Sequence, residues 1–286
     1  MVRAERWLRV RNTLPTVVQY VLLIGLAFLS FALVLLMLAL SLRPGVLIYA
    51  DFWHLIPIPP YLGNYRTALL SLIPSMVRTL IVAAVSISGV LLLSAPASYA
   101  FARMRFPGGG LLFYVVLAVM TIPGIILLTP NFILANQLHL TGSLWGLIVF
   151  YVAGGLPFAI FLVTTFFRTQ PAEVFEAARV DGASDMQALV RLAIPLAFPI
   201  LVTVAIMNFL SVYGDFIWPS LILNESNQTL LMALQAFSPQ LGQFLSRPDF
   251  GVQSAGYAFA TIPQLIIFAL GMKYFVQGVT SGAVKA

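Results

Sequence analysis

Six long apolar stretches constrain this chain more than any other feature of its sequence. A helix needs roughly 20 mostly apolar residues to cross a bilayer core about 30 Å thick. Only 8% of the 286 residues are charged and the mean hydropathy is +0.99, so a soluble globule could not cover its surface with polar groups. The sequence therefore predicts an all-α membrane protein with six transmembrane helices. We expect them at 17–42, 76–102, 111–129, 143–167, 196–215 and 252–276.

The positions of Lys and Arg predict the orientation. Eleven of the fifteen precede the first stretch, follow the second, lie between the fourth and fifth, or end the chain. The positive-inside bias places these segments, and both termini, in the cytoplasm. The net charge of +6 thus reflects membrane orientation, and we expect no nucleic-acid partner. The first stretch is too long for the core of a signal peptide, so we expect it to be retained.

The inner segment 168–195 carries the clearest local signals. Pro171 suits the first turn of a helix, and Gly182 suits the position after its end. Ser184 followed by Gln187 is a capping-box pattern for a second helix, which Pro195 would break. The pattern predicts a helix–turn–helix at the cytoplasmic surface, anchored in two spans. It could be a docking surface or a solvated connector.

Within this segment the spacing resembles the EAA motif of the integral membrane permeases of ABC importers. Glu176-Ala-Ala is followed after three residues by Gly182, and after nine more by Leu192-Ala-Ile-Pro195. Leu192 stands where the family has Ile, and Ile194 stands where it has Leu; both changes conserve side-chain volume. Arg78 stands where the family usually has Asn. The segments 62–65, 99–108, 215–223 and 278–285 resemble the MalG-like branch of the carbohydrate (maltose-type) permeases.

The resemblance implies a type I importer permease fold in the cell inner (plasma) membrane, multi-pass. The expected partners are a second permease in a heterodimer, two cytoplasmic ATPase subunits, an extracytoplasmic solute-binding protein and a carbohydrate substrate. We expect 1–75 to form a cytoplasmic tail, the first transmembrane helix and an outer loop, and 76–286 a five-helix core with the EAA loop at 168–195. The residues expected to couple to the ATPase are Glu176, Ala177, Ala178, Arg179, Asp181 and Gly182.

The C-terminal tail has two interpretations. The resemblance implies that Ser281, Gly282 and Lys285 contact the ATPase, whereas a frayed terminus is the structural alternative.

The sequence offers no catalytic residues. A phosphate-binding loop requires G-x-x-x-x-G-K-[ST], and neither Lys273 nor Lys285 sits in such a frame. The chain has no cysteine, and its two histidines are far apart in sequence. We therefore expect a transport subunit without its own ATPase site, metal or cofactor, with ATP and Mg on the partner subunits.

Polar residues mark one face of the fifth stretch. Asn208, Ser211 and Asp215 are spaced by three and four residues, which places them on one side of a helix. They could line a translocation path that binds sugar hydroxyls, or they could hydrogen-bond between helices.

Two other functions stay open. An ATP-driven importer of a non-sugar solute would carry the same EAA motif. A stand-alone secondary carrier would need ionisable residues near mid-membrane, and the predicted spans offer none there.

Overall fold

A computed structural model describes residues 2–235 and 249–283, with side chains from 18 to 235 and from 249 to 274. Every regular element in these ranges is a helix, as the apolar stretches predict. The chain divides into two compact units. One comprises Met1–Leu70 with Phe237–Phe259, and the other comprises Ser71–Ala236 with Ala260–Ala286.

The first unit holds α1 (Val2–Ser41), α2 (Gly45–Ala50) and the beginnings of α3 (Gly63–Arg103) and α13 (Phe250–Ala283). The chain between α1 and α3 is held by two buried side chains. Arg43 donates to the backbone oxygens of Leu47 within α2 and of Asp51 and Phe52 just after it. Asn64 donates to the backbone oxygens of Ser41 and Arg43 at 2.9 and 2.7 Å. These bonds satisfy carbonyl groups that a helix end leaves without partners.

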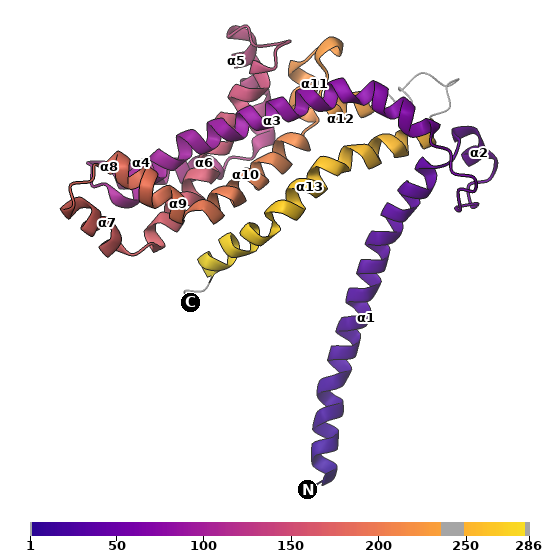
Figure 1. Cartoon of the computed structure of the whole chain (residues 1–286), viewed down its shortest axis with the longest axis horizontal. Helices are drawn as coiled ribbons and strands as arrows, with labels where there is room; N and C mark the ends of the chain where they lie inside the picture. Colours follow the sequence, from indigo (N-terminus) through magenta and orange to yellow (C-terminus); the bar gives the residue numbers. More distant parts are fainter. Residues whose placement is uncertain (1, 236–248, 284–286) are drawn as a thin grey trace. The chain divides into compact units, whose positions relative to one another are not determined.

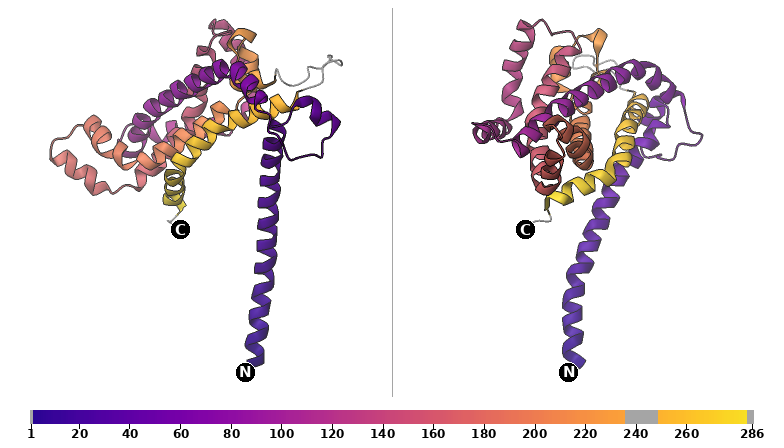
Figure 2. Two further views of the ribbon diagram at one scale, coloured as in Figure 1. Left: turned by 45° about the vertical axis from the view of Figure 1, so that its right-hand side comes forward. Right: turned by 60° about the vertical axis from the view of Figure 1, so that its left-hand side comes forward.

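The second unit contains the loop 168–195, which is predicted to couple to the ATPase. Figure 1 shows α7 and α8 at one end of this unit, away from α5 and α11, and the left view of Figure 2 agrees. Its further helices are α4 (Gly109–Met120), α5 (Gly124–Gln137), α6 (Trp145–Thr169), α7 (Ala172–Val180), α8 (Asp185–Ala188), a π-helical turn (Leu189–Ala193), α9 (Ile194–Leu196), α10 (Phe198–Tyr213), α11 (Ile217–Ile222), a 3₁₀ turn (Glu225–Asn227) and α12 (Leu230–Gln235).

Four described helices are long and apolar enough to cross a membrane: Val18–Ser41, Gly63–Arg103, Trp145–Thr169 and Phe250–Tyr274. Two bent pairs raise the number to six if each counts as one span.

The third predicted stretch, 111–129, does not form one straight helix. Helix α4 ends at Met120 and α5 begins at Gly124, at 99° to it. Pro123 lies between them, and proline cannot donate the hydrogen bond that would continue the helix. The fifth predicted stretch, 196–215, likewise follows a bend: α10 begins at Phe198 and makes 75° with the segment Asp185–Leu196.

A buried apolar cluster joins α3 and α6 to the inner loop. Tyr99 from α3, Phe167 from α6 and Phe175 from α7 meet in it, together with the turns on either side of α9. The core of the bundle therefore extends to the loop between α6 and α10. The other members are Val90, Ala159, Val163, Ala188, Leu189, Ala193, Ala197, Ile200 and Val204.

Candidate coupling surface and the α6–α10 interface

Helix α7 ends in a Schellman motif at the predicted glycine. Gly182 has φ +80°, a left-handed conformation that glycine adopts without strain. Its N–H donates to the Arg179 oxygen at 3.0 Å, and the Ala183 N–H donates to the Ala178 oxygen at 2.9 Å. These are the two bonds that define the motif. A sharp turn therefore follows Asp181.

The second helix begins with the predicted capping box. The Ser184 N–H donates to Oε1 of Gln187 at 2.9 Å, and the Gln187 N–H donates to Oγ of Ser184 at 3.3 Å. Arg179 and Asp185 approach to 3.6 Å across the turn, in an exposed ion pair that contributes little by itself. The two caps fix the angle between α7 and α8.

Pro195 does not end this second segment as predicted, because the segment continues to Leu196. Leu189–Ala193 forms a π-helical turn just before the proline. In a regular α-helix the proline ring would clash with the carbonyl four residues earlier, at Arg191. The wider turn relieves this clash, and the bend falls at Ala197.

Phe175 anchors α7 to the rest of the bundle. Its side chain is 4% exposed, and its ring centre lies 6.3 Å from that of Tyr99. Sequence reasoning missed this anchor, although an apolar residue inside the charged helix was a usable signal. A nine-residue helix is marginal by itself, so this contact and the caps hold α7 in place.

The predicted coupling residues lie on the outer side of the same helix. Glu176, Ala177, Arg179, Asp181 and Gly182 are exposed, and Ala178 is half-buried. The structure thus gives α7 one anchored face and one open face. The open face carries both charge signs and a small-residue surface, which suits close contact with another protein.

The fifth-span residues do not share one environment. Asp215 accepts from the Tyr151 hydroxyl at 2.9 Å and, through its other oxygen, from the Ile217 N–H at 2.9 Å. It thereby joins α6 to the start of α11. Ser211 is exposed.

Asn208 lies against a glycine of α6. Its Nδ2 donates to the Val204 oxygen of its own helix at 2.9 Å. A Cβ atom built on Gly155 would lie 2.5 Å from Oδ1 of Asn208 and 2.9 Å from Cγ2 of Val90. Asn208 therefore lies within the α6–α10 interface, and Asp215 lies just beyond it, between α6 and α11. Neither Tyr151 nor Gly155 was a predicted partner, because nothing in the local sequence pairs distant helices.

The tail residues are only partly described. Ser281 and Gly282 belong to the last turns of α13, whose backbone alone is described there, and Lys285 lies outside the described residues. No group of three His, Asp or Glu side chains in the described ranges could hold a metal ion.

The comparisons with known proteins agree with the helical fold. The family described as "Binding-protein-dependent transport system inner membrane component" matches residues 92–281. A probable ABC transporter permease of Pyrococcus horikoshii is 32% identical over 86% of this chain and 89% of its own length. The trehalose transport system permease protein SugB of Mycobacterium tuberculosis is 34% identical over 92% of this chain and 94% of its own.

The diacetylchitobiose uptake system permease protein NgcG of Streptomyces coelicolor is 32% identical over 68% of this chain and 64% of its own. A crystal structure of a bacterial ABC transporter involved in the import of the acidic polysaccharide alginate contains a chain with the same fold. The TM-score is 0.79 and the identity 23%, and the match covers 91% of this chain and 95% of that one. The chain belongs to the family of binding-protein-dependent transport system inner membrane components, the permease subunits of ABC importers. The resemblance seen in the EAA spacing is thereby confirmed.

Proposed function

We propose that this chain is one permease subunit of an ATP-driven carbohydrate importer and that α7 is its coupling helix. The observation that carries the proposal is the two-sided character of α7: Phe175 is buried in the bundle core while Glu176, Arg179 and Asp181 face outward. A partner that grips the outer side would move the core as a unit. The trehalose and diacetylchitobiose permeases among the relatives support a sugar substrate.

The partner of α7 is a cytoplasmic ATPase subunit. Carboxylates at Glu176 and Asp181 offer charge-assisted hydrogen bonds to basic groups, and Ala177 leaves room for close approach. When ATP closes the pair of ATPase subunits, α7 moves with them and the spans turn from inward-open to outward-open. The motion of α7 reaches α3 and α6 through the contacts of Phe175. It reaches α10 through α8 and α9, which connect α7 to α10 along the chain.

The complete importer contains a second permease, two ATPase subunits and an extracytoplasmic solute-binding protein. The chain crosses the inner membrane six times, with both termini in the cytoplasm. Residues 1–75 form the peripheral part and 76–286 the permease core. ATP and Mg bind to the ATPase subunits, and the end of α13 with the tail (Ser281, Gly282 and Lys285) faces them. Asn208, Ser211 and Asp215 lie beside the translocation path, which both permeases form.

Reconstitution tests this function. The chain would be co-expressed with the permease, ATPase and solute-binding proteins encoded beside it and placed in proteoliposomes. We expect uptake of labelled di- and oligosaccharides that requires ATP and the binding protein. Uptake of an amino acid or phosphate instead of any sugar would contradict the substrate class. Uptake by liposomes that lack the ATPase subunits would contradict the class of transporter and indicate a secondary carrier.

A further inference from the structure

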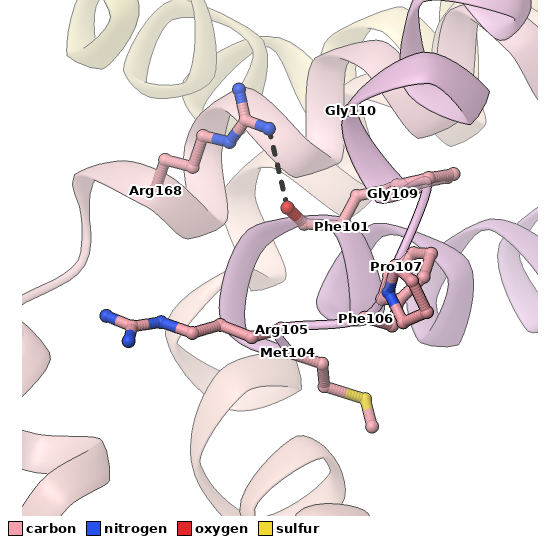
Figure 3. A pocket seen from close by; sticks show the side chains of 8 residues that line it. All are labelled: Phe101, Met104, Arg105, Phe106, Pro107, Gly109, Gly110 and Arg168. Atoms are coloured by element: carbon pink, nitrogen blue, oxygen red, sulfur yellow. Dashed lines mark hydrogen bonds between the residues drawn. The ribbon is translucent and has the colours of Figure 1, made fainter.

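A basic pocket lies where the chain turns from α3 into α4. Its volume is about 470 Å³, and it is lined by loop 104–108, the start of α4 and the end of α6. We propose that this pocket binds the phosphate of an anionic phospholipid of the cytoplasmic leaflet. Figure 3 shows its lining residues, which are Phe101, Met104, Arg105, Phe106, Pro107, Gly109, Gly110 and Arg168.

Two arginines from separate segments supply the charge. Arg105 comes from the loop and Arg168 from α6, and both are exposed. In Figure 3 their side chains extend on the side of the pocket away from Pro107. The lining contains no carboxylate, and among the described residues Arg105 makes neither a hydrogen bond nor an ion pair. Guanidinium groups bind phosphate oxygens through charge-assisted hydrogen bonds. A bound anion would therefore accept hydrogen bonds from the free N–H groups of these arginines.

Arg168 is held at the pocket by two contacts within the chain. Its guanidinium carbon lies 4.8 Å from the centre of the Phe113 ring, and its Nη2 donates to the Phe101 oxygen at 3.4 Å. These contacts hold the planar group at the pocket rim while leaving most of its N–H donors available. The side chain therefore needs little reordering to bind a phosphate.

The neighbouring surface indicates that the phosphate belongs to a lipid. Directly after Gly110, the first turns of α4 expose Leu111 at 72% and Tyr114 at 70% of their areas, with Leu112 and Val115 half exposed. A free phosphate would leave this apolar face uncovered. A phospholipid would cover it with its acyl chains and place its charge beside the arginines. Basic pockets between helices at the cytoplasmic boundary are a recognised mode of anionic headgroup binding.

Lipid in this pocket would support the coupling loop. Arg168 stands only a few residues before α7, and Arg103 beside it donates to the oxygens of Phe167 and Gln170. The inference relies on the proposed function only for the side of the membrane on which the pocket lies. Its test measures lipid binding and not transport, so the two can fail separately.

Native mass spectrometry of the delipidated full-length chain in detergent tests the site. The probes are dioleoylphosphatidylglycerol, dioleoylphosphatidylcholine and inorganic phosphate. We expect preferential binding of phosphatidylglycerol, reduced about fivefold by Arg105→Gln or Arg168→Gln and about 25-fold by both. The matched control is Arg191→Gln, which removes an exposed arginine of the same end of the unit and should leave binding unchanged. Arg105→Lys with Arg168→Lys should retain much of it, because the charge is kept.

Equal phosphatidylglycerol binding by the wild type and the double glutamine variant would overturn the proposal. Equal binding of phosphatidylcholine, or displacement by an equimolar amount of inorganic phosphate, would also overturn the assignment to an anionic lipid. Helicity by circular dichroism establishes that each variant is folded.

Discussion

The guanidinium carbon of Arg103 lies 4.2 Å from the centre of the Phe175 ring, so the last residue of α3 contacts the middle of α7. The same guanidinium donates to the oxygens of Phe167 and Gln170 at 2.6 and 2.7 Å. These carbonyls lie at the end of α6, where a helix leaves such groups without intrahelical partners. One side chain thus connects α3, α6 and α7, and we expect a displacement of α7 to be passed to both long helices.

Loss of the Phe175 ring should detach α7 from the bundle. Phe175→Ala removes a buried aromatic contact that costs about 3–5 kcal/mol in a packed core. We expect faster proteolysis within 171–195 and more ATP hydrolysed per sugar imported. Val174→Ala changes an adjacent, exposed residue and should behave as wild type. Normal coupling in Phe175→Ala would contradict the anchoring role.

Gly182 should tolerate asparagine better than valine. Nothing lies within 4 Å of a Cβ atom built there, so the cost of substitution comes from the positive φ alone. A β-branched residue in this conformation costs about 1–2 kcal/mol or more, whereas Asn adopts it readily. We expect sugar import to fall strongly in Gly182→Val and only mildly in Gly182→Asn. Gly182→Asp, which adds a charge at little strain, should also uncouple ATP hydrolysis from import. Equal import by the valine and asparagine variants would show that the turn is unimportant.

Charge reversal at Glu176 should abolish coupling without unfolding the chain. Glu176 is exposed, and such surface changes usually alter stability by less than about 0.5 kcal/mol. Glu176→Lys should insert and melt normally while import falls at least tenfold. Glu173→Lys, one turn earlier and outside the EAA motif, is the control and should retain most import. The assignment fails if the two variants import sugar at the same rate.

Adjacent glycines of α6 should respond differently to alanine. Gly155→Ala forces a methyl group against Asn208 and Val90, and such overpacking costs about 1–3 kcal/mol. Gly154 has nothing within 4 Å of its Cβ position, so Gly154→Ala should be neutral or slightly stabilising. Thermal melting in detergent measures both. Asn208→Ala should restore part of the stability lost by Gly155→Ala, and its failure to do so would place the strain elsewhere.

The Tyr151–Asp215 hydrogen bond should be measurable as a coupling energy. Tyr151→Phe and Asp215→Ala each break it, so a double-mutant cycle should give about 1 kcal/mol or more of interaction. Ser211→Ala, on the same helix but exposed, should leave the melting temperature unchanged. Additive effects of the first two substitutions would show that the bond contributes nothing to the interface.

Local signals predicted local structure well. The Schellman glycine and the capping box were readable because each involves residues within a few positions of one another, and backbone geometry leaves them few alternatives. Pro123 marked the interruption between α4 and α5, but its 99° angle depends on what each half packs against. The contact of Arg103 with Phe175, and of Gly155 with Asn208, joins helices distant in sequence. Neither has a periodic pattern that one sequence could reveal.

The π-helical turn ahead of Pro195 has a consequence for how loop lengths vary. An i→i+5 turn holds one residue more than the α-helical turn it replaces, so the chain has one residue here that a regular helix would not need. Removing that residue would leave the flanking segments at the same azimuth about the helix axis. A natural variant with eight residues in place of nine after Gly182, and with another residue in place of the proline, would therefore present the same outward surface.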